Sequence, residues 1–181
     1  MGALQATSLL IRDKCDILIH INVNVNKSAP AYDRIWAFQA TCEEYHVPYD
    51  IDLSVKGASY HELLDVIREI FNKIESKYPD QKKGIFLAND TYANMFLNLI
   101  FQKYETFPST YEIVGFDNSP IASEAILPIT TIGQQIDVIA KTAMDLLVQQ
   151  MEEQKKRVPK PLGEPIHKQI TPILIRRNTT E

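Results

Sequence analysis

The sequence predicts an α/β fold with three layers, in which a doubly wound parallel sheet is covered by helices on both faces. Two observations support this prediction. The 181-residue chain is 45% hydrophobic and 23% charged, which is typical of one globular domain. Its hydrophobic period also switches repeatedly between that of a strand and that of a helix. Strands that alternate with helices are joined by right-handed crossovers, which make neighbouring strands parallel.

The first part of the chain is expected to form two helices and two strands. Residues 3–13 suit a helix, and the apolar segment 16–22 suits a buried strand. In residues 31–46 apolar side chains recur every three or four positions, so they would share one face of a helix. Residues 49–53 predict a shorter strand.

The middle of the chain carries signals for the starts of two helices. Ser59 and Glu62 have the spacing of a capping box, in which each side chain bonds the other residue's backbone N–H, so a helix should begin there. A strand at 84–88 follows. Asp90 can cap the next helix, because its carboxylate can accept a bond from an unpaired backbone N–H. Residues 111–116 predict another strand.

The last part begins with a short helix. Ser119 followed by Pro120 fits the cap and the first position of a helix, because the fixed φ of proline suits that position. Residues 129–132 are extended, a long helix covers about 135–155, and 168–176 close the chain as a strand.

The composition argues against several classes of function. A net charge of -4, from 19 Lys and Arg against 23 Asp and Glu, does not suit a surface that binds nucleic acid through its phosphates. No apolar run approaches the ~20 residues of a membrane span, and the amino end lacks a secretion signal, so we expect a cytoplasmic protein. Cys15 and Cys42 are expected to be small buried residues. The basic cluster within 155–160 fits a solvated helix end.

The sequence shows little sign of catalytic or metal-binding chemistry. It has only six glycines, and neither of the glycine-rich phosphate-binding patterns occurs. Asp90 and Asp117 both follow strands and could form an acid/base pair, although a helix cap and a turn former explain them equally well. We therefore expect no catalytic residue, no metal site and no cofactor. The histidines stand at no metal-ligand or triad spacing and are expected to be solvated or singly bonded: His20, His46, His61 and His167.

A parallel sheet predicts where a ligand would bind. The loops beyond the carboxyl ends of the strands line the ligand crevice, and here they carry 22–30, Asn89 with Asp90, and Asp117. Arg34 lies in the first turns of the helix that follows the first of these loops. A guanidinium suits carboxylates or adjacent hydroxyls, although the position of Arg34 by itself favours a solvated surface residue.

A set of motifs covers nearly the whole chain. It includes GIFLANDTYANMFL at 84–97, EIVGFDNSPIASEAILPITTIGQQ at 112–135 and the terminal LIRRNTT. In this order, these segments resemble the LacI/GalR family of bacterial sugar-responsive repressors. The amino end is similar as well, because GALQATSLLIRDKCDILIHI resembles the family's helix and strand after the first interlobe crossover, and DRIWAF resembles its arginine-containing helix. Each motif alone would be weak, but together they are specific.

The resemblance implies how the chain is organised. In that family a small helix-turn-helix module reads DNA, and a two-lobed domain similar to periplasmic sugar-binding proteins senses an effector. This chain has no room for the DNA-binding module, so any DNA contact would need a module outside it. The resemblance also implies that 1–134 and 169–181 form the C-terminal lobe, whereas 135–168 belongs to an otherwise missing N-terminal lobe.

An effector site follows from the same resemblance. The chain departs from the family pattern at Ala37, where glycine is usual, and in the loop 22–26, which contains three asparagines. Four side chains fall on family positions that hydrogen-bond the effector, and their donors and acceptors suit a polyol: Arg34, Asn89, Asp117 and Gln134.

We therefore interpret the chain as the effector-sensing domain of a LacI-type repressor, with a sugar-like small molecule as effector, without catalytic function and without membrane contact. The alternative is a sugar-binding protein of a transport system, and a third possibility is an enzyme that uses Asp90 and Asp117. Apolar residues on several faces of 91–104 predict a homodimer through that helix and 119–126, as the resemblance also implies. The helix at 135–155 should be mobile or buried against another copy of the chain.

Overall fold

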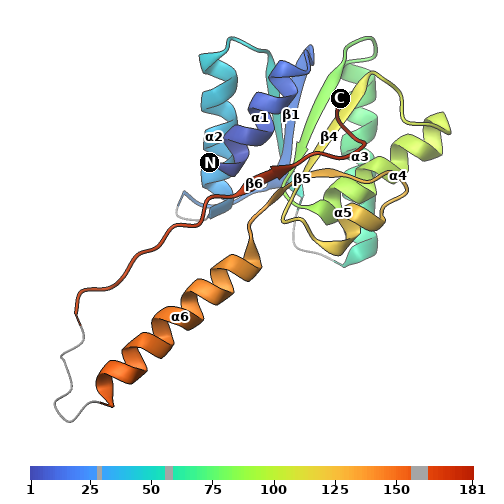
Figure 1. The fold of residues 1–181 in the computed structure, drawn as a ribbon. Coiled ribbons are helices and arrows are strands. Elements are labelled where there is room, and N and C mark those ends of the chain that lie inside the picture. The colour runs from blue at the N-terminus through green and yellow to red at the C-terminus, as the bar shows by residue number, and fades with distance from the viewer. Residues whose placement is uncertain (28–29, 56–58, 156–162) are drawn as a thin grey trace.

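A six-stranded sheet forms the centre of the molecule in a computed structural model that describes residues 1–27, 30–55, 59–155 and 163–181 (Figure 1). The strand order is β2-β1-β3-β4-β5-β6, and every neighbouring pair from β2 to β5 is parallel. The predicted α/β class is confirmed. The strands are β1 (Ile17–Val23), β2 (Tyr49–Val55), β3 (Lys83–Leu87), β4 (Tyr111–Phe116), β5 (Thr130–Gly133) and β6 (Ile173–Ile175).

Helices cover both faces of the sheet, which confirms the predicted three layers (Figure 1). One face carries α1 (Gly2–Arg12) and α2 (Pro30–Glu44), and the other carries α3 (Tyr60–Lys77), α4 (Asp90–Tyr104) and the short α5 (Pro120–Glu124). Alternate residues of each strand enter two separate hydrophobic clusters, one on each face. In β1, for example, Ile19 and Ile21 face the α3–α4 side, and Leu18 faces the α1–α2 side.

The last strand departs from the predicted parallel sheet. β6 pairs antiparallel with β5, and Leu174 lies opposite Ile132. The reason is that α6 (Ile136–Gln154) does not pack back across the sheet to form a crossover but projects away from the carboxyl ends of the strands (Figure 1). The chain therefore returns at the edge it left and runs in the opposite direction. The strand is also shorter than the predicted 168–176, and Pro172, which has no N–H to donate, immediately precedes it.

The predicted helix starts are partly confirmed. Both bonds of the capping box between Ser59 and Glu62 are present at the start of α3. At α4, however, the cap is Asn89 and not Asp90, because the Asn89 carboxamide accepts the Tyr92 N–H at 2.9 Å. Asp90 is instead the first helical residue, and its buried carboxylate has other partners.

The prediction that α4 has apolar residues left over for a second subunit to cover is wrong. The apolar residues of this helix that seemed to exceed one face are buried inside this chain, because α4 is enclosed by the sheet, α3 and α5. They need no second subunit to leave water. The fully or nearly fully buried residues of α4 include Met95, Phe96, Leu97, Leu99 and Ile100.

The long helix α6 has no buried residue. Apolar side chains such as Met144 (57% exposed) and Leu147 (49% exposed) lie in water along it. The prediction that this helix is mobile or buried against another copy of the chain remains a prediction. Most of the basic cluster expected within 155–160 lies outside the described residues. Among the described helices, none is long and apolar enough to cross a membrane.

Candidate functional site

Three of the four predicted site residues line one cavity. Arg34 comes from α2, Asn89 from the end of β3 and Asp117 from the end of β4, so the carboxyl ends of adjacent parallel strands bring them together. The cavity has a volume of about 160 Å³. Its other lining residues are Asn22, Val23, Ala31, Ala88 and Tyr92.

Arg34 is fixed by two contacts and is not a solvated surface arginine. Its Nη1 donates to the Ala88 carbonyl oxygen at 2.6 Å, and its Cζ lies 4.4 Å from the centre of the Phe116 ring. Burial lowers the pKa of Arg34 from its ordinary value, and the nearby Asp117 carboxylate acts in the opposite direction. The guanidinium stays charged and keeps further N–H donors for a ligand.

Asp117 is aimed by an unusual backbone turn. Its φ is 101° and that of Asn118 is 52°, values that aspartate and asparagine tolerate better than most residues. The Asp117 N–H donates to the Ile132 carbonyl oxygen at 2.8 Å, which ties the turn to β5. Gln134, the fourth predicted residue, does not line the cavity but donates its amide N–H to the Asp117 carboxylate. It therefore orients a lining residue.

Asn89 has two roles. Its Oδ1 accepts the Tyr92 N–H and so caps α4, and its Nδ2 can donate to a ligand. Together with Arg34 it makes the cavity rich in donors, whereas Asp117 supplies acceptor oxygens. Hydroxyl groups both donate and accept, so this set of groups suits a hydroxylated ligand.

Asp90 supports the site from outside the cavity. Its Oδ1 accepts the Thr131 hydroxyl at 2.6 Å, and its Oδ2 accepts the Ser119 N–H at 2.7 Å. Burial raises the pKa of Asp90, while these hydrogen bonds act to lower it. The possible acid/base pair of Asp90 and Asp117 gains no support, because Asp90 is engaged with protein groups and does not line the cavity.

Sequence reasoning missed Asn22 and His20. Asn22 was noted only as part of an unusual loop, yet it lines the cavity. The expectation that each histidine is solvated or singly bonded is wrong for His20, which is fully buried with ring nitrogens near Phe86 and Asn22. Their signal in the sequence was a pair of polar residues two positions apart in an otherwise apolar strand. The other histidines, His46, His61 and His167, are exposed.

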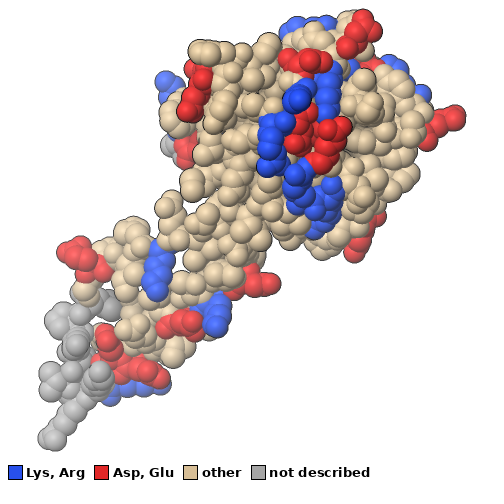
Figure 2. Space-filling view, turned by 45° about the horizontal axis from the view of Figure 1, so that its top comes forward, with Lys and Arg blue, Asp and Glu red and all other residues tan. Residues whose placement is uncertain are grey.

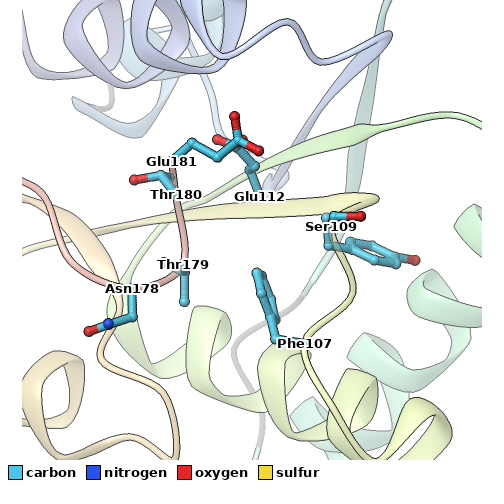
Figure 3. Close-up of a pocket in the computed structure, with 8 residues that line it drawn as sticks. Phe107, Ser109, Glu112, Asn178, Thr179, Thr180 and Glu181 are labelled. Carbon is cyan, nitrogen blue, oxygen red and sulfur yellow. The ribbon is translucent and has the colours of Figure 1, made fainter.

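A second cavity lies at the opposite ends of the strands (Figure 3). It has a volume of about 130 Å³, and its wall includes Phe107, Ser109 and Glu112 near the carboxyl terminus of the chain. Glu112 is almost fully buried, and its Oε1 lies 2.7 Å from Lys82 Nζ. Among the described residues, no group of three or more His, Cys, Asp or Glu side chains could hold a metal ion.

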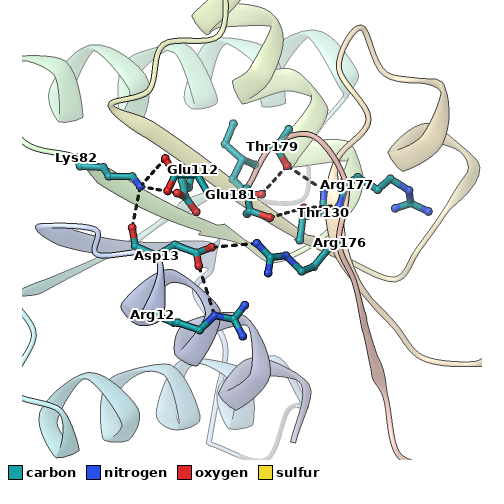
Figure 4. A network of polar contacts seen from close by, with 11 residues as sticks. Arg12, Asp13, Lys82, Glu112, Thr130, Arg176, Arg177, Thr179 and Glu181 are labelled. Atoms are coloured by element: carbon teal, nitrogen blue, oxygen red, sulfur yellow. Dashed lines mark hydrogen bonds and ion pairs between the residues drawn. The ribbon is translucent and has the colours of Figure 1, made fainter.

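The buried carboxylates at this end belong to a charged network that joins distant segments (Figure 4). Lys82 also donates to the Asp13 carbonyl oxygen at 2.8 Å, and Asp13 lies within 3.8 Å of Arg176 and 3.5 Å of Arg12. Figure 2 shows acidic side chains enclosed by basic ones on this part of the surface. The network connects the end of α1 with β3, β4 and the segment after β6.

Comparisons with known proteins show the same fold. Residues 9–180 match the family described as periplasmic binding protein-like domain. The chain is 26% identical over 178 residues to a ribose operon repressor of Halalkalibacterium halodurans, covering 98% of this chain and 50% of that protein. It is also 26% identical over 180 residues to the ribose operon repressor of Escherichia coli K12, covering 99% and 51%. The chain thus spans about half the length of these relatives.

Solved structures of other proteins have the same fold as this chain. A LacI family transcriptional regulator from Arthrobacter sp. FB24, in complex with lactose, superposes with a TM-score of 0.79 at 17% identity, covering 99% of this chain and 63% of that one. A LacI family regulator from Enterococcus faecium with bound ribose superposes with a TM-score of 0.75 at 19% identity, covering 99% and 62%. The resemblance seen in the sequence is confirmed.

Proposed function

Since the chain belongs to the family of periplasmic binding protein-like domains, we propose that it is the effector-binding part of a LacI-type transcriptional repressor in the cytoplasm. The observation that carries this proposal is the cavity in which Arg34, Asn89 and Asp117 converge. The relatives named above are repressors, and none of them favours a transport protein. The protein binds its ligand and does not transform it.

The effector is a sugar or a similar small polar metabolite. Among the described residues, the charged ones that line the cavity are one arginine and one aspartate, so their formal charges cancel. Arg34 and the Asn89 Nδ2 donate to ligand oxygens, and Asp117 accepts from ligand hydroxyls while Gln134 holds its carboxylate. Donors and acceptors held at fixed positions distinguish ligands by the direction of their hydroxyl groups.

We also propose the lobe assignment that the resemblance implies. Residues 1–134 and 169–181 form one lobe, and 135–168 packs on a second lobe of a longer protein. The exposed apolar side chains of α6 support this proposal, as does the fact that the relatives are about twice as long. DNA binding would then reside in a further module outside this chain.

The test is a titration of this chain with D-ribose and with lactose, followed by NMR because chemical shifts also report weak binding. Arg34→Lys keeps the charge but loses the planar fork of donors, and Asp117→Asn keeps a residue that tolerates positive φ. Each variant should weaken binding by about tenfold, because each removes a charge-assisted hydrogen bond.

Arg68→Lys is the matched control, because Arg68 lies on α3 and its side chain is 47% exposed. It should bind as tightly as the wild type. Equal affinity of Arg34→Lys, Asp117→Asn and the wild type for a sugar that binds would refute the assigned roles.

A further inference from the structure

Asn22, near the carboxyl end of β1, lies at the floor of the cavity and is held at both polar atoms of its amide. Its Oδ1 accepts the Val23 N–H at 2.8 Å, and its Nδ2 lies 3.1 Å from Nε2 of His20. The same Nδ2 lies 3.5 Å from the Ala31 carbonyl oxygen in the first turn of α2. The amide therefore has one orientation before any ligand arrives.

His20 can serve Asn22 only as an acceptor. Its Nδ1 lies 2.9 Å from the Phe86 carbonyl oxygen, which cannot donate, so Nδ1 carries the hydrogen and Nε2 keeps its lone pair. The pKa of His20 is lowered to about 4, mainly by burial; the Phe86 bond acts to raise it and Arg34 acts to lower it. The imidazole is neutral at pH 7 and stacks on the Phe86 ring, with 4.6 Å between the ring centres.

We propose that Asn22 is a further residue of the effector site and that His20 is the positioning residue that sets its amide. The inference rests on the proposed function. One lone pair of Asn22 Oδ1 is taken by Val23, and the other accepts a ligand hydroxyl. Since Asn22 is only 1% exposed, it contacts the part of the ligand that reaches the floor of the cavity. It adds a neutral acceptor beside the donors of Arg34 and Asn89.

The first test needs no ligand. In ¹⁵N-labelled protein at pH 7, the His20 ring should show a protonated Nδ1 and an unprotonated Nε2. His20→Phe keeps a ring against Phe86 but removes the acceptor, so it should shift the Asn22 amide signals. A His20 ring protonated at Nε2 in the wild type would overturn the proposal, whatever the stability of the variant.

The second test is a double-mutant cycle with D-ribose or lactose, whichever sugar binds the wild type more tightly. We expect His20→Phe and Asn22→Ala each to weaken binding by about fivefold, and the double variant to bind no more weakly than Asn22→Ala alone. A purely structural role for His20 predicts instead that the two losses multiply. The control is His61→Phe, on the exposed surface of α3, which should bind as the wild type does.

The same titration tests the role of Asn22 separately from the proposed effector binding. Support requires that the side-chain signals of Asn22 move together with those of Arg34 as sugar is added. Movement at Arg34 and Asn89 without movement at Asn22 would overturn the role of Asn22 and leave the proposed function intact. If neither sugar moves any of these signals, the proposed function fails and the role of Asn22 fails with it.

Discussion

At the residue scale, one glycine permits the contacts that support the site. A Cβ added at Gly115 would lie 2.3 Å from Asp90 Oδ1, the atom that accepts the Thr131 hydroxyl. Thr131 Oγ1 in turn accepts a hydrogen bond from the Asn118 N–H, with 3.3 Å between nitrogen and oxygen. Asn118 follows the positive-φ residue Asp117. The absence of a side chain at Gly115 thus lets Asp90 brace the turn that carries Asp117, which lines the cavity.

Gly115→Ala should therefore lower the free energy of unfolding by about 1–3 kcal/mol, because the new methyl group must displace a buried carboxylate. Urea denaturation of the two proteins measures the difference. Gly163→Ala is the matched control, since nothing lies within 4 Å of its added Cβ, and it should change stability little. Equal stability of Gly115→Ala and the wild type would show that Asp90 can move without loss.

At the scale of elements, Glu112 connects β4 to the other segments of the charged network. Its side chain is only 3% exposed, and Lys82, immediately before β3, is its ionic partner. The pKa of Glu112 is raised to about 7, mainly by burial; Lys82 acts to lower it and the nearby Asp13 acts to raise it. Because the ordinary value is 4.5, the folded protein holds a proton that the unfolded chain releases.

This proton predicts a pH dependence with a definite sign. The contribution of Glu112 to stability is fully present below about pH 4.5 and is lost as the pH rises through about 7. Glu112→Gln should remove this loss, so the variant should gain stability relative to the wild type as the pH rises from 5 to 8. Urea denaturation at several pH values measures the difference between the two proteins.

The pH dependence of the wild type alone would not isolate Glu112, because the titration of His20 changes stability with pH in the opposite direction. Its pKa is lowered to about 4 in the folded protein, so its contribution rises with pH over part of the same range. Glu181→Gln is the control, since the Glu181 side chain is 74% exposed in the same network. If the difference between Glu112→Gln and the wild type is independent of pH, Glu112 is not protonated in the folded state at neutral pH.

At the scale of the whole molecule, α6 should be the least protected helix. Each large apolar side chain left in water forgoes ~1.5–3 kcal/mol, and α6 has no buried residue to offset this. In dilute solution its amides should exchange hydrogen rapidly, whereas those of α4, which is packed within the domain, should exchange slowly. Protection of α6 that grows with protein concentration would show burial against another copy. Strong protection in a monodisperse monomer would contradict the prediction.

Dimerisation through 91–104 and 119–126 remains a prediction, on a different basis from the one the sequence suggested. The apolar residues of α4 are buried internally, but Ile126 just beyond α5 is 64% exposed and Tyr104 at the end of α4 is 38% exposed. Sedimentation of the chain at high micromolar concentration should show a dimer that Ile126→Lys weakens. A wild type that sediments as a monomer under these conditions would argue against a dimer through this surface.

The sequence by itself determined the order of the elements, the three layers and the family. The elements and layers follow from hydrophobic periodicity and capping residues, which act over a few neighbouring positions, whereas the family followed from the resemblance of the motifs at 84–97 and 112–135. The family resemblance pointed to Arg34, Asn89 and Asp117, and these three residues line one cavity. Strand order alone predicted only that Asn89 and Asp117 share an edge of the sheet, because the carboxyl ends of parallel strands meet there.

Only the tertiary structure decided the contacts between distant positions. Asp90 bonds a residue 41 positions away, so no local pattern shows that it braces a turn. His20 and Asn22 are only two positions apart, but the Phe86 carbonyl oxygen that leaves Nε2 of His20 as an acceptor lies 66 positions away. The direction of β6 depended likewise on α6, which leaves the sheet instead of crossing it. These features depend on which groups can pair or leave water once the chain is folded, and that is a property of the packed molecule.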